Sequence, residues 1–90
     1  MPTVYKVKGD NTDLIFGKGQ LVEYATQQLA ENLEYFKSDK LKLHYEPSEL
    51  KVLTKIITDV ITKGKTISKQ EHAMLVLGMK GLAVTKVELY

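Results

Sequence analysis

The most apolar part of the chain, residues 73–79, predicts the central element of the fold. Just before it, Ser68 and Glu71 have the spacing of a capping box, in which both side chains accept hydrogen bonds from backbone N–H groups of the first helical turn. Gly81 follows, where glycine can take the left-handed conformation that ends a helix. Since a helix without a polar face must be buried on several sides, we expect other elements, or a second copy of the chain, to enclose it.

Two longer helices are predicted by apolar residues that recur with the helical period. The first covers residues 20–37, and the second covers residues 47–63, with Pro47 in its first turn and Gly64 after its end. The second is rich in β-branched residues, which favour a strand, but its length and period favour a helix. The apolar positions are Val22, Ala25, Leu29, Leu33 and Phe36 in the first helix, and Leu50, Leu53, Ile57 and Val60 in the second, widened by Val52, Ile56 and Ile61.

Alternation of apolar and polar residues predicts the strands. Residues 3–8 and 14–16 are expected to form a hairpin around a turn at residues 9–13, which contains the glycine, asparagine and aspartate typical of reversals. Residues 41–45 have the pattern of a further strand with one solvated face, and residues 83–90 have that of a closing strand. The predicted order of elements is therefore β-β-α-β-α-α-β.

These elements predict an α+β fold: a small, mostly antiparallel sheet of three or four strands with three helices packed on one face. A length of 90 residues predicts a single domain over residues 1–90, and 43% hydrophobic with 27% charged residues is typical of a globular chain. The beginning of the chain lacks the apolar segment of a signal peptide, and the longest apolar run is too short to span a bilayer. We therefore expect a soluble, cytoplasmic protein without a membrane partner.

The charged residues are nearly balanced, with 13 basic and 11 acidic side chains and a net charge of +2. This balance does not favour a polyanion as the main partner. All basic residues are lysine, and the arginine fork that usually recognises guanine and phosphate is absent. Because lysine codons are rich in adenine, we hypothesise that the gene belongs to a low-GC bacterium or its phage.

The residue types that carry catalysis are sparse, so we predict no enzyme, no catalytic residues, no cofactor and no metal ligands. Cysteine is absent, and the two histidines, His44 and His72, have no metal-binding spacing. The three serines lie outside any nucleophile elbow. Residues 17–19, Gly-Lys-Gly, precede a helix but lack the remaining residues of a phosphate-binding loop.

The alternative function that the sequence leaves open is nucleic-acid binding. The predicted helices at about 47–63 and 68–80, followed by a strand, have the outline of a helix-turn-helix with a wing. In that case the residues expected to contact phosphate are Lys51, Lys55, Lys65 and Lys69. The apolar half of the second of these helices, and the absence of arginine, argue against reading of a DNA groove.

The preferred prediction is a small non-enzymatic protein-interaction or regulatory module. The apolar helix has more surface to bury than one layer can cover, so its partners are expected to be other copies of the chain, as a homo-oligomer, or another protein. The expected interface residues are Met74, Leu75, Leu77 and Met79.

Self-association of this kind is tested by analytical ultracentrifugation of the whole chain. We expect a mass above that of one chain at micromolar concentration. A monomer throughout that range would count against it.

Overall fold

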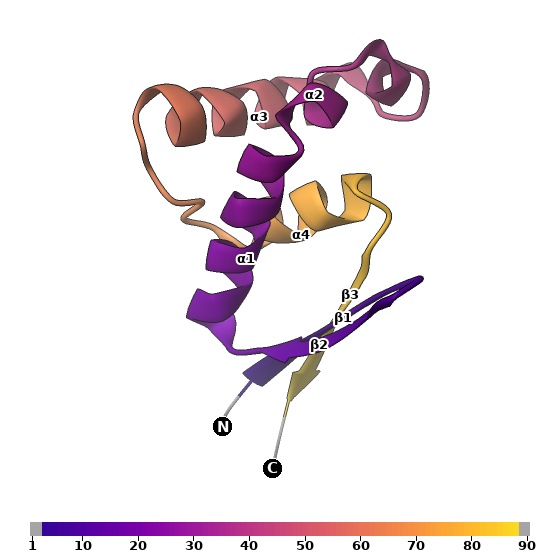
Figure 1. Ribbon diagram of the computed structural model, residues 1–90, viewed down its shortest axis with the longest axis vertical. Coiled ribbons are helices and arrows are strands. Elements are labelled where there is room, and N and C mark those ends of the chain that lie inside the picture. Colours follow the sequence, from indigo (N-terminus) through magenta and orange to yellow (C-terminus); the bar gives the residue numbers. More distant parts are fainter. Residues whose placement is uncertain (1–2, 89–90) are drawn as a thin grey trace.

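The computed structural model describes residues 3–88 and confirms the predicted α+β class (Figure 1). The elements are β1 (Thr3–Gly9), β2 (Thr12–Phe16), α1 (Lys18–Glu31), α2 (Leu33–Phe36), the 3-10 helix η1 (Asp39–Leu43), α3 (Pro47–Ile57), the π-helical segment η2 (Thr58–Thr62), α4 (Gln70–Met79) and β3 (Ala83–Glu88). Within the described residues, no helix has the length and apolar character needed to cross a membrane.

The sheet is antiparallel throughout, with the strand order β2-β1-β3. β1 and β2 form the predicted hairpin around a turn at Asp10 and Asn11. Alternate residues of a strand point to opposite faces, and β1 thereby places Tyr5 and Val7 in the core. The helices lie on one side of the sheet (Figure 1). β3 supplies the closing strand, whose predicted residues 89 and 90 lie outside the described part of the chain.

Helix α4 is the centre of the core, as its apolar sequence predicts. Ala73, Val76 and Leu77 are completely buried, and Met79 retains only 2% exposure. α1 packs along α4, and α4 also contacts α3 and β3. Figure 1 shows α4 between the sheet and α3, with α1 passing in front of it. The chain itself therefore encloses most of this helix.

The start of α4 differs from the prediction, because Ser68 and Glu71 do not form a capping box. The cap residue is Lys69, which has an extended backbone and makes no side-chain capping hydrogen bond. The position of the chain here is set by Ile67, which is buried and whose N–H donates to Thr26 Oγ1 on α1 at 3.0 Å. The end of α4 follows the prediction, since Gly81 has φ +90°.

The other predicted helices form with small changes at their ends. The helix predicted at residues 20–37 is divided at Asn32, whose backbone leaves the helical region, into α1 and the short α2. The helix predicted at residues 47–63 consists of α3 and the π-helical η2, in which the Lys63 N–H donates to the Thr58 carbonyl at 3.3 Å. Gly64 follows with φ +67°, as expected for a helix end.

The strand predicted at residues 41–45 is wrong, because this part of the chain belongs to η1 and the turn after it. Leu41 is buried, whereas Leu43 is 82% exposed, so the alternating leucines do not share a face. The His44 and Tyr45 N–H groups donate to the Leu41 carbonyl at 3.2 and 3.1 Å, which closes local turns in place of a ladder. An alternation this short fits a turn as well as a strand. Within residues 3–88 the sheet consequently has three strands.

The central position of α4 predicts a large effect of truncating Leu77. Replacing Leu77 by alanine should lower the free energy of unfolding by about 2–5 kcal/mol, since it removes buried methyl groups and leaves a cavity. Urea denaturation measures this change. The matched control is Leu43→Ala on the exposed η1, for which the expected change is within about 0.5 kcal/mol. Equal effects at the two positions would contradict the burial of α4.

Candidate functional site

A groove of about 370 Å³ lies between the α2–η1 segment and the outward face of α3 and η2. Its deepest residues belong to the core, and Leu50 and Ile57 beside them are only partly buried. Ile61 is 43% exposed. The residues that line the groove are Phe36, Lys37, Ser38, Leu41, Lys42, Leu50, Leu53, Thr54, Ile57, Thr58, Ile61 and Thr62. Six of the twelve lining residues are apolar, so the groove leaves part of the apolar surface of α3 and η2 uncovered.

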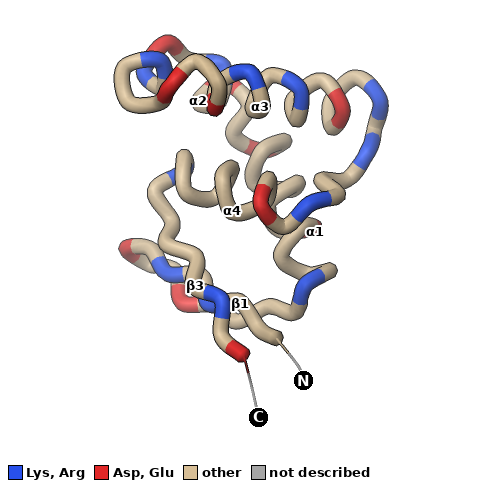
Figure 2. The backbone as a smooth tube through the Cα atoms, turned by 180° about the vertical axis from the view of Figure 1, so that it is seen from behind, with Lys and Arg blue, Asp and Glu red and all other residues tan. Residues whose placement is uncertain are grey.

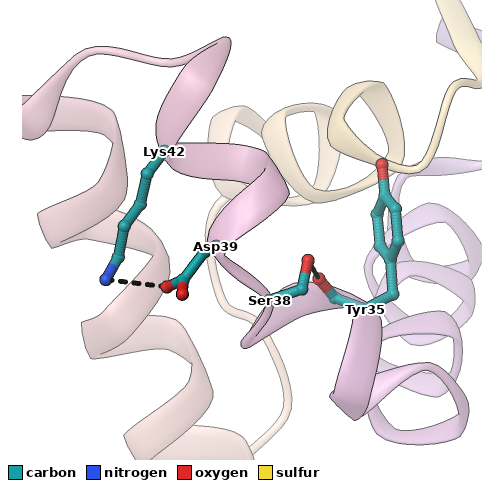
Figure 3. Close-up of polar contacts among 4 residues, drawn as sticks. All are labelled: Tyr35, Ser38, Asp39 and Lys42. Atoms are coloured by element: carbon teal, nitrogen blue, oxygen red, sulfur yellow. Dashed lines mark hydrogen bonds and ion pairs between the residues drawn. The ribbon is translucent and has the colours of Figure 1, made fainter.

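Three of the four hydroxyl groups in the groove, those of Ser38, Thr54 and Thr58, donate hydrogen bonds within the chain. Thr54 Oγ1 donates to the Leu50 carbonyl at 2.9 Å, and Thr58 Oγ1 donates to the Thr54 carbonyl at 3.0 Å. On the opposite wall, Ser38 Oγ donates to the Tyr35 carbonyl at 2.8 Å (Figure 3). Because these protons satisfy the backbone, the groove offers a ligand few free hydroxyl donors. Its chemistry is that of an apolar surface with charged side chains beside it.

The charge at the groove is positive. Among the lining residues, which all belong to the described part of the chain, Lys37 and Lys42 carry charge and none is acidic. Lys42 Nζ lies 3.0 Å from Asp39 Oδ1 in a solvent-exposed ion pair, which contributes little to stability (Figure 3).

Figure 2 shows further basic residues along α3. The lysines of α3, Lys51 and Lys55, are exposed, and each stands three residues before a groove threonine. Residues at this spacing are neighbours on a helix, so Lys51 and Lys55 lie beside the α3–η2 wall, as does Asp59, three residues before Thr62.

The α2–η1 wall is anchored to α4 through Tyr35. The Tyr35 hydroxyl donates to the Met79 carbonyl at the end of α4, and Lys80 Nζ lies 5.1 Å from the centre of the Tyr35 ring. The neighbouring Phe36 packs edge-on to Tyr35, with ring centres 5.4 Å apart. These contacts fix the position of the wall relative to the core.

Tyr45, at the end of the same segment, remains neutral at physiological pH. Burial raises the pKa of its phenol above the usual value, and the nearby Tyr35 and Glu49 raise this pKa further. Tyr45 therefore adds no charge to the basic surroundings of the groove.

The four residues predicted as an interface are divided between core and surface. Leu77 and Met79 are buried in the chain's own core. Met74 and Leu75 are partly buried and pack against it. Only Met74 and Leu75 can therefore meet a partner in the folded chain.

The lysines proposed as phosphate contacts, Lys51, Lys55, Lys65 and Lys69, are all exposed. The helices beside them do not resemble a helix-turn-helix pair, because residues 63–69 separate η2 from α4, a longer link than the usual turn of three or four residues. Within α4, Glu71 and Gly78 are the exposed positions. α4 therefore has little polar surface with which to enter a DNA groove.

The two histidines lie apart from the groove. His44 is exposed at the end of η1, and His72 lines a smaller cavity of about 260 Å³ that also includes Asp59, Lys65 and Ser68. Among residues 3–88, no cluster of three or more histidine, aspartate or glutamate side chains is arranged to hold a metal ion.

Comparison with known proteins gives no further guide to the site: no protein-family model, no curated protein and no solved structure matches this chain.

The sequence contained one signal of the groove. The apolar positions of residues 47–63 are too widely spread around the helix for a single buried stripe, because they include Ile61 as well as Leu53 and Ile56. Ile56 enters the core, Ile57 and Ile61 line the groove, and the buried Leu53 lies between core and groove. The α2–η1 wall could not be foreseen in this way, because the sequence pattern predicted a strand at residues 41–45.

The anchoring role of Tyr35 predicts a measurable loss of stability in Tyr35→Phe. This variant keeps the ring but removes the hydroxyl that satisfies the Met79 carbonyl, so the free energy of unfolding should fall by about 0.5–1.5 kcal/mol. Urea denaturation gives the value. An unchanged midpoint and slope would show that this hydrogen bond does not hold the groove wall.

Proposed function

We propose that this chain is a small non-enzymatic protein-interaction module that binds an acidic, amphipathic helix of another protein in the groove between η1 and α3. The observation that carries this proposal is a groove with six apolar lining residues, two lysines on its α2–η1 wall and no acidic lining residue. A helix with an apolar stripe flanked by aspartate or glutamate can bury its stripe against the apolar lining residues and pair its carboxylates with the lysines.

The length of the groove favours a helical partner. Along α3 and η2 the lining residues run from Leu50 to Thr62, which corresponds to about 18 Å at a helical rise of 1.5 Å per residue. A partner helix of about three turns has this length and can present apolar residues at every third or fourth position. The engaged threonine hydroxyls favour such apolar contacts over polar recognition of a small ligand.

Nucleic acid is the less favoured partner at this surface. The lysines could contact phosphates, but a phosphate backbone would leave Leu50, Ile57 and Ile61 without apolar contacts. α4 also has little exposed polar surface with which to read bases. The two possibilities predict different responses in one binding experiment.

The test measures binding of a synthetic three-turn helix that carries leucines on one face and glutamates on both flanks. We expect micromolar affinity by isothermal titration calorimetry. Ile61→Asp should weaken binding at least about tenfold, since it places a charge in the apolar groove. Circular dichroism verifies that this variant is folded. A peptide with the leucines replaced by serine is the matched ligand control.

Charge reversal tests the contribution of the two lysines on the α2–η1 wall. The double variant Lys37→Glu and Lys42→Glu should weaken peptide binding. The same change at Lys6 and Lys8, exposed on β1 and away from the groove, should leave the affinity unchanged. Equal losses in both double variants would indicate non-specific attraction. Steeply salt-dependent binding of duplex DNA without peptide binding would replace the proposal with the nucleic-acid alternative.

A further inference from the structure

The sheet has an open edge at β2 that carries apolar side chains. β2 pairs with β1 on one side, and among residues 3–88 no strand pairs with its other side. Ile15 is 63% exposed and Leu14 is 37% exposed. An edge strand with exposed apolar residues and unpaired backbone groups is a template for pairing with another strand.

The register of the hairpin determines which backbone groups of β2 face outward. Gly9 and Thr12 are opposite each other across the turn and close the hairpin. Antiparallel ladders alternate between hydrogen-bonded and non-hydrogen-bonded pairs, and the pair that closes a two-residue turn is of the first kind. The backbone groups of Thr12, Leu14 and Phe16 are therefore directed at β1. Those of Asp13 and Ile15 are directed at the open edge.

The opposite edge of the sheet is less suited to pairing. By the same alternation, the backbone groups of Val84, Lys86 and Glu88 are directed outward from β3. Lys86 and Glu88 form an ion pair of 4.0 Å there, and both side chains are more than half exposed. Charged side chains of this kind protect an edge strand from pairing. β2 has Asp13 as its one charged residue.

We propose that two copies of this chain pair through β2, antiparallel, about a two-fold axis at Leu14. In this register Leu14 faces Leu14 of the other copy, and Asp13 faces Ile15 on either side. A shift of the axis to Asp13 would place two aspartates opposite each other, which is unfavourable. A shift to Ile15 would require pairing by Gly17, which is the N-cap of α1. The Leu14 register is the one compatible with both constraints.

The resulting dimer has a continuous sheet in the order β3-β1-β2-β2-β1-β3. The groove between η1 and α3 remains uncovered, since Figure 1 shows α3 at the end of the molecule far from the sheet. This inference does not depend on the proposed function of the groove. It places self-association at β2, whereas the sequence predicted it at α4.

Disulfide trapping tests the register directly, because the chain has no cysteine of its own. A residue facing its own symmetry mate in a non-hydrogen-bonded pair has a Cα separation of about 4.5 Å, which a disulfide can span. Leu14→Cys should therefore form a covalent dimer under mild oxidation at least about tenfold faster than Ile15→Cys, whose symmetry mate is beyond disulfide range. Equal rates, or faster trapping of Ile15→Cys, would overturn the proposed register.

Proline substitutions test the edge without cysteine chemistry. Ile15→Pro removes an N–H that is directed away from β1, so the hairpin ladder is preserved while pairing between copies is blocked. Analytical ultracentrifugation should find twice the 10.2 kDa mass of one chain for the wild type and one mass for this variant. Lys86→Pro is the matched control at the other edge and should remain dimeric. A monomeric wild type, or a dimer that persists in a folded Ile15→Pro, would overturn the proposal.

Discussion

The burial of α4 is the constraint on which the rest of the structure depends. Its residues have almost no polar face, and the free energy of the fold depends on removing Val76, Leu77 and Met79 from water. α1 contributes its buried stripe to this purpose, the sheet contributes its inner face, and α3 contributes Leu53 and Ile56. α1, the sheet and α3 therefore each use one face to bury the apolar core around α4.

The surfaces left over after α4 is covered are the ones available for interaction. α3 has apolar residues on a wider arc than α4 can cover, and the α2–η1 segment meets only part of the remainder. The groove is the surface that stays open between them. At the other end of the molecule, the sheet ends at β2, and Ile15 on this strand is exposed. The groove beside α3 and the open edge of β2 are thus two places where apolar side chains remain exposed after the core has formed.

The parts of the fold that could be predicted from sequence are those with long or clear periodicity. The β1–β2 hairpin, the three longer helices and the closing strand have such patterns, and they form where expected. Residues 41–45 were mistaken for a strand because a few alternating residues do not distinguish a strand from a 3-10 turn. The capping box at Ser68 was displaced by a long-range contact, the burial of Ile67 against α1, which local spacing cannot reveal.

The site was harder to predict than the fold for a physical reason. Apolar residues are drawn equally to a core and to an interface, and Leu77 and Met79 lie in the core. The groove depends on residues from two segments, near Lys42 and Ile61, that come together only in three dimensions. Its one sequence signal, the excess apolar width of α3, indicates a second face but not what covers it.

Native-state hydrogen exchange tests the central position of α4 most directly. Because Val76 and Leu77 are completely buried where α4 packs against α1, α3 and β3, their amides should exchange only through global unfolding. The free energy of exchange at these amides should therefore equal the free energy of unfolding. The amides of η1 and the turn after it, such as His44, should exchange through local opening at lower free energy. Protection of α4 no greater than that of η1 would contradict this account.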